Sequence, residues 1–164
     1  AMTVSDVLGR VAALATPLVE VTGGEPLCQA ATPALLEALC DGGYETLLET
    51  NGTRDISGLD ERVARIVDVK CPSSGHADAN RWANAAALTA HDEVKFVIAD
   101  RADFDWALAA VAEHALAGRC PITVQAVAGR CDPAELADWL LASGADLRLG
   151  LQVHKLLWQG RAGV

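Results

Sequence analysis

The chain has 164 residues, and 51% of them are hydrophobic, so we expect a single domain over 1–164 with a sizeable core. Its net charge of −9 opposes binding to phosphate backbones, which excludes nucleic acid as an expected partner. No apolar run is long enough for a membrane span and no secretory signal opens the chain, so we expect a cytoplasmic protein with no membrane partner.

Helical and strand periods alternate along the chain. The segment 5–15 has apolar residues at helical spacing, with Ser5 or Thr3 as its N-cap, and Thr32-Pro33 is typical of a helix start. The expected elements are, in order, a helix over 5–15, a strand over 18–22, a helix from 32, a strand over 46–49, a strand within 62–68, a short helix over 82–88, a strand over 93–99, a helix over 103–116, a strand over 122–127, a helix over 133–142 and a strand over 147–153.

Nearly continuous apolar strands that alternate with helices predict an α/β fold with a parallel sheet. Such sheets bind ligands at the carboxyl ends of their strands, and polar residues of this chain gather at those positions. They are Thr22 to Glu25 after the first strand, 49–52 after the second, 68–70 after the third, Gln125 in the fifth, and His154 with Lys155 at the last. Each group alone is equally typical of a turn, but their coincidence predicts a site along one rim.

The sequence Gly23-Gly24-Glu25-Pro26 follows the first strand directly. Paired glycines let a ligand reach bare backbone amides and carbonyls, because no Cβ stands in the way. Glu25 adds an acceptor for a cationic group. A plain turn and a seat for an amino-acid-like ligand both fit these four residues taken alone.

The cysteine and histidine spacings predict neither a zinc site nor a disulfide framework. The five cysteines are odd in number and include no Cys-x-x-Cys pair, so we expect them to be structural. Lys95 is unusual because it interrupts an apolar strand. Its ammonium could pair with a carboxylate inside the sheet or point to solvent at the strand's edge.

Five segments, read together, carry a resemblance. They are Glu-Val-Thr-Gly-Gly-Glu-Pro-Leu (20–27), Leu-Glu-Thr-Asn-Gly-Thr (48–53), Asp-Val-Lys-Cys-Pro-Ser-Ser-Gly (68–75), Asp-Glu-Val-Lys-Phe-Val-Ile (92–98) and Arg-Leu-Gly-Leu-Gln-Val-His-Lys (148–155). The set resembles the 7-carboxy-7-deazaguanine synthase family of radical S-adenosylmethionine enzymes, which act in queuosine-type deazapurine biosynthesis. The last two segments indicate this family in particular, whereas the Gly-Gly-Glu-Pro and Glu-Thr-Asn-Gly elements occur widely in the superfamily.

The resemblance implies a homodimer with an incomplete (β/α) barrel, parallel strands inside and helices outside. It implies the cofactors S-adenosylmethionine, a 4Fe-4S cluster and Mg2+. The implied activity is that of a lyase that converts 6-carboxy-5,6,7,8-tetrahydropterin to 7-carboxy-7-deazaguanine by radical ring contraction with loss of ammonia. The product feeds a tRNA modification pathway.

The resemblance also implies roles for single residues. It assigns cofactor binding to eight residues. Gly23, Gly24 and Glu25 would bind the methionine end of the cofactor, Glu49, Asp68, Val69 and Lys70 would line its other side, and Gln125 would lie near the adenosine. Substrate binding falls to Thr22, His154 and the Val164 carboxylate. No residue of this chain is expected to bind metal, and no catalytic residue is assigned.

One departure from the family pattern is large. The family holds its cluster with three cysteines in a Cys-x3-Cys-x2-Cys-like loop near the start of the protein, and this chain has no such loop. We therefore expect the carboxyl-terminal two-thirds of such an enzyme, inactive alone, with the barrel's first strand missing. The strand over 18–21 would then present an unpaired edge, which predicts association through it. The alternatives are a non-catalytic module that binds S-adenosylmethionine and an unrelated α/β barrel enzyme.

Overall fold

The computed structural model describes residues 2–158, except for the side chains of residues 154 and 156. The strands are β1 (Leu18–Val21), β2 (Glu45–Thr50), β3 (Ala64–Val69), β4 (Glu93–Ile98), β5 (Ile122–Ala126) and β6 (Arg148–Gly150). The helices are α1 (Val4–Ala12), α2 (Thr32–Asp41), α3 (Arg101–Glu113), α4 (Pro133–Ser143) and α5 (Val153–Trp158). Short 3-10 segments cover η1 (Pro26–Cys28), η2 (Pro72–Ser74), η3 (Ala77–Ala79) and η4 (Trp82–Ala87).

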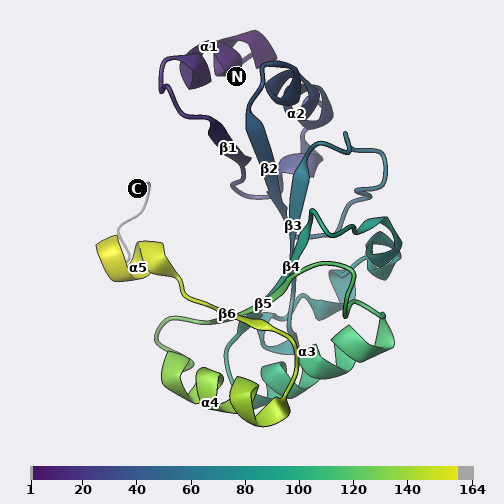
Figure 1. The fold of residues 1–164 in the computed structure, drawn as a ribbon, viewed down its shortest axis with the longest axis vertical. Coiled ribbons are helices and arrows are strands. Elements are labelled where there is room, and N and C mark those ends of the chain that lie inside the picture. Colours follow the sequence, from purple (N-terminus) through teal and green to yellow (C-terminus); the bar gives the residue numbers. More distant parts are fainter. Residues whose placement is uncertain (1, 159–164) are drawn as a thin grey trace.

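The six described strands form one sheet in chain order, and every neighbouring pair is parallel. Figure 1 shows them as a row that begins at β1 and ends at β6, and these two strands do not meet. The sheet is therefore an open, partial (β/α) barrel, which confirms the predicted fold class. Because β1 is an edge strand of the described sheet, the predicted dimerisation through this edge stays a prediction.

The two faces of the sheet differ in burial. Along β2, β3, β4 and β5, buried residues alternate with half-buried ones, as a strand's period of two requires. The buried set includes Leu48, Val67, Phe96 and Val124, which pack against the helices of one face. The half-buried set, on the other face, contains Glu49, Asp68, Lys95 and Gln125. We call this second face the open face, because its side chains keep partial access to solvent.

Helix starts follow the sequence signals closely. Thr3, and not Ser5, is the N-cap of α1, where it forms a reciprocal capping box with Asp6. Asp100 caps α3 and Asp132 caps α4. Among the described residues, no helix is both long enough and apolar enough to cross a membrane.

Two expected elements are wrong in extent or type. The strand expected over 147–153 pairs with β5 only over Arg148–Gly150, and the chain is already helical from Val153. Beyond Gly150, strand pairing gives way to a side-chain contact, in which Gln152 Oε1 accepts the Ala128 amide at 3.1 Å. The helix expected over 82–88 is the 3-10 segment η4.

Candidate functional site

The Gly-Gly turn leaves β1 with an open backbone. Gly23 and Gly24 have φ angles of +96° and +60°, a region that other residues enter only under strain. A Cβ at either position would meet no heavy atom of the described residues within 4 Å. The turn thus exposes backbone amides and carbonyls to a space that a ligand can fill.

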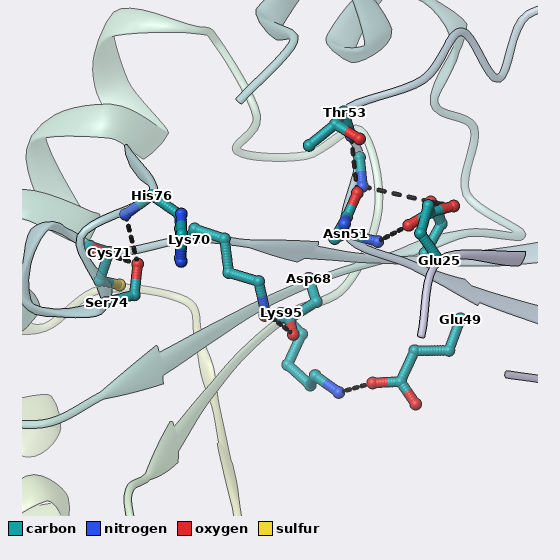
Figure 2. A network of polar contacts seen from close by, with 12 residues as sticks. Glu25, Glu49, Asn51, Thr53, Asp68, Lys70, Cys71, Ser74, His76 and Lys95 are labelled. Carbon is teal, nitrogen blue, oxygen red and sulfur yellow. Dashed lines mark hydrogen bonds and ion pairs between the residues drawn. The ribbon is translucent and has the colours of Figure 1, made fainter. Parts of the chain in front are cut away.

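Glu25 fixes this turn to the end of β2. Its carboxylate accepts hydrogen bonds from the Leu27 amide at 3.0 Å, the Thr50 hydroxyl at 2.8 Å and the Asn51 amide at 2.7 Å. Figure 2 shows Glu25 turned toward Asn51. A carboxylate has about four acceptor positions, so Glu25 retains capacity for one more donor. Its predicted role toward a cationic group stays a prediction, and the structure adds a positioning role.

The end of β2 is held by a second set of polar contacts. The Asn51 side chain accepts the Thr53 amide at 3.0 Å. Asn84 donates to the carbonyls of Gly52 at 2.9 Å and Arg54 at 2.8 Å. Sequence reasoning missed Asn84, because nothing in the sequence around η4 indicates that its side chain contacts residues 52 and 54, which lie 32 and 30 positions earlier in the chain.

The end of β3 is fixed in a similar way. Asn80 accepts the Lys70 amide at 3.0 Å and donates to the Lys70 carbonyl at 2.9 Å. Of the residues that follow, Cys71 is buried, and Asp103 of α3 accepts both the Ser73 amide and its hydroxyl. Asn80 and Asp103 were also missed, since each acts on a residue distant in sequence.

Charged side chains form a row across the open face near these strand ends. Lys95 of β4 forms an ion pair with Glu49 of β2, and Lys70 pairs with Asp68 at 2.7 Å (Figure 2). Glu49 also accepts a hydrogen bond from the Thr22 hydroxyl at 3.4 Å. Of the two positions considered for Lys95, pairing with a carboxylate inside the sheet is the one observed.

Asp68 has an oxygen without a partner. Its Oδ2 accepts from Lys70, but its buried Oδ1 has no hydrogen-bond partner among the described residues. A buried acceptor left unpaired costs about 1–3 kcal/mol. This oxygen is therefore a place where a ligand's hydroxyl or amine would be stabilised.

A cavity of about 290 Å³ is lined in part by Asp68. Its polar lining comes from the ends of β3 and β5 and from the segment after β6, and includes Asp68, Lys70, Ser73, Arg130 and Gln152. Gln125 lies on the open face of β5, opposite Val97 of β4 and Gly150 of β6.

The predicted site residues fall into three groups. The first group lies along the carboxyl-end rim or on the open face, with Glu25 bracing the rim; it contains Thr22, Gly23, Gly24, Glu25, Glu49, Asp68, Lys70 and Gln125. Val69 is buried among core side chains, so only its backbone faces the rim. The His154 side chain and Val164 lie outside the described part of the chain.

The three implied cofactors fit these residues unequally. S-adenosylmethionine fits, because the glycine turn offers open backbone and Asp68 offers a free acceptor. A 4Fe-4S cluster does not fit, since it needs converging thiolates. Burial raises the pKa of the Cys71 thiol to about 12 and raises those of Cys120 and Cys131, while Cys28 is exposed elsewhere. Among the side chains that the structure describes, no group of three or more His, Cys, Asp or Glu could hold a metal ion.

Comparison with known proteins places the chain in a family. No family model matches it. The 7-carboxy-7-deazaguanine synthase of Chlorobaculum tepidum is 44% identical over 96% of this chain and 73% of that protein, and the one of Koribacter versatilis is 42% identical over 86% and 69%.

Solved structures agree on the fold. A crystal structure of Streptococcus suis SuiB matches 93% of this chain and 44% of its own, with a TM-score of 0.61 at 14% identity. SuiB bound to S-adenosylmethionine matches 89% of this chain and 40% of its own, with a TM-score of 0.57 at 12% identity. At such identities the likeness is one of fold alone, and it agrees with the open parallel sheet and its surrounding helices. By its sequence relatives, the chain belongs to the 7-carboxy-7-deazaguanine synthase family.

Proposed function

We propose that this chain binds S-adenosylmethionine at the carboxyl-end rim of its sheet and forms the cofactor-binding part of a 7-carboxy-7-deazaguanine synthase. The substrate would be 6-carboxy-5,6,7,8-tetrahydropterin, converted with loss of ammonia. The observation that carries the proposal is the open glycine turn after β1 together with the unpaired Asp68 oxygen on β3 of the same sheet, in a chain of this family.

The residues divide the binding work by their chemistry. The open backbone of Gly23 and Gly24 would bind the ammonium and carboxylate of the methionine part, as open backbone at a strand end allows. Asp68 Oδ1 would accept a ribose hydroxyl, which would satisfy its missing hydrogen bond. Thr22, one residue before the turn, would face the pterin.

Turnover requires more than this chain supplies. The cluster, when bound, provides the electron that cleaves the sulfonium, and no three of the five cysteines converge to hold it. We therefore propose that this polypeptide alone does not catalyse the family reaction. The same observation favours a second candidate function, a non-catalytic module that binds S-adenosylmethionine.

Calorimetry with S-adenosylmethionine tests the binding claim. The Gly24→Val variant should lose at least about tenfold in affinity, because a branched Cβ would fill the space beside the turn. Gly43→Val is the matched control: Gly43 has a similar φ of +79° and open space, but it lies before β2, at the opposite end of the sheet. Equal affinity in both variants, or no binding by the wild type, would overturn the proposal.

A turnover assay tests the proposed inactivity of this chain alone. After iron-sulfur reconstitution, the chain with substrate, S-adenosylmethionine and a strong reductant should give no 7-carboxy-7-deazaguanine. Product formation would refute the proposed inactivity and establish the chain as a complete synthase.

A further inference from the structure

We propose that Lys95 is a positioning residue for the cofactor seat: its ammonium holds the Glu49 carboxylate against Thr22, next to the glycine turn. This inference rests on the proposed function for its link to S-adenosylmethionine. Its electrostatic part concerns the chain's own residues and can be tested without any ligand.

The path of the Lys95 side chain is the first argument. In the sheet register, Lys95 of β4 lies directly opposite Asp68 of β3. Its ammonium nevertheless pairs with Glu49 on β2, one strand further away. The side chain therefore crosses over β3, and the lysine and glutamate side chains are only 17% and 29% exposed. A lysine that served only solubility would extend into water.

The contact continues to the rim. Glu49 accepts the Thr22 hydroxyl at 3.4 Å, and Thr22 immediately precedes Gly23. Lys95, Glu49 and Thr22 thus form a line of side-chain contacts from β4 across the open face to the turn after β1. Moving Glu49 would release the Thr22 side chain at the point where the cofactor and substrate are proposed to meet.

The charges facing Glu49 give the second argument. Glu20 approaches from β1, Asp68 lies on β3, and Lys95 comes from β4, while Lys70 is engaged with Asp68. Burial first, and then the Glu49 charge, raises the pKa of Glu20, whereas Lys95 lowers it. Lys95 is therefore the cation that balances the Glu20 and Glu49 carboxylates. Without it, the two carboxylates would repel each other, and Glu49 would lose the contact that holds it near Thr22.

The decisive measurement is NMR of the free protein at pH 7. Carboxyl-carbon NMR of protein labelled at glutamate, with the Glu49 signal identified by its loss in Glu49→Gln, follows this group directly. Lys95→Met should shift the Glu49 signal and, through it, the methyl signal of Thr22, because the ion pair and the hydrogen bond from the Thr22 hydroxyl form one line of contacts. Lys95→Arg should keep both signals near their wild-type positions. An unchanged Thr22 signal in Lys95→Met would overturn the proposal.

Binding of S-adenosylmethionine gives the functional readout. The Lys95→Met variant should bind about tenfold more weakly, because Glu49 would no longer be held against Thr22. Lys95→Arg should bind as the wild type does. In a Glu49→Gln background, Lys95→Met should add nothing, because the group it acts through is gone. An equal loss of affinity with and without Glu49 would mean that Lys95 contacts the ligand directly and would refute the positioning role.

The outcomes separate this inference from the proposed function. If the wild type fails to bind S-adenosylmethionine, the proposed function fails, while the NMR signals of the free protein still decide whether Lys95 positions Glu49. If Lys95→Met lowers the urea midpoint without moving the Glu49 and Thr22 signals, the lysine is merely structural. Lys95→Arg retains the cation and tests the same contact in a variant that we expect to fold.

Discussion

Replacing Glu25 by glutamine tests whether this carboxylate holds the glycine turn in place. Glu25 accepts hydrogen bonds from Leu27, Thr50 and Asn51 at 3.0, 2.8 and 2.7 Å. Glutamine keeps one oxygen, so its amide group would face at least one of these donors. One lost hydrogen bond to a charged group costs about 1.5–3 kcal/mol, and the remaining bonds become neutral and roughly half as strong. We expect Glu25→Gln to lower the free energy of unfolding by about 2–4 kcal/mol.

Urea denaturation at pH 7 measures this loss, which corresponds to a Tm lower by roughly 5–15 °C for a domain of this size. Glu37→Gln is the matched control, because Glu37 lies on the exposed side of α2. It should stay within about 0.5 kcal/mol of the wild type. If the two variants unfold at the same urea concentration, the Glu25 carboxylate does not brace the turn, and the reasoning from its three hydrogen bonds is refuted.

Two further substitutions test the frame behind the site. Asp92→Asn should cost about 3–5 kcal/mol, because Arg65 is buried and would lose its charge partner at 2.6 Å. Burial tends to raise the pKa of Asp92, but hydrogen bonds from Arg65 outweigh it and keep the pKa lowered. The pair's contribution is therefore present above about pH 4 and lost as the pH falls through the lowered pKa, so a stability-versus-pH curve should be flatter on its acid side in the variant. Gly52→Ala should cost about 2–5 kcal/mol, because Gly52 has a φ of +69° and its new Cβ would lie 2.8 Å from Cγ1 of Val67. Gly43→Ala has the strain without the clash and should cost about 1–2 kcal/mol by the same unfolding assay, so equal losses would contradict the predicted clash.

The order of strands and helices could be predicted because each buried strand is a short apolar run bounded by turn residues. The last strand could not, since residues 147–153 alternate as a strand does. Its length depends on β5, which pairs with Arg148–Gly150 and then ends at Ala126. A strand stops where its partner stops, and the partner's end is not visible in the strand's own sequence.

The candidate site, like the fold, was predictable from the sequence only in part. Its rim residues were predictable, because polar groups at strand ends of a parallel sheet meet at one edge. The side chains that fix the rim were not. Asn80, Asn84 and Asp103 come from 3-10 segments and from the first turn of α3, and each bonds to a strand end at least ten residues away. Such contacts are set by how loops fold back, which neither periodicity nor capping signals describe.

The rim contains two kinds of residue, and substitutions of the two kinds should have different effects. The proposed ligand contacts are mostly backbone groups and charges on the open face, whereas the bracing side chains Glu25, Asn80 and Asn84 use their polar atoms on the protein's own backbone. Backbone groups cannot be tuned by substitution, so their positions are set by these three residues. The charges can be tuned, and the open-face row links them through Lys95 and Glu49. Rim geometry and rim charge are therefore separable properties of this fold: the first depends on buried hydrogen bonds from the loops, and the second depends on one lysine that crosses β3.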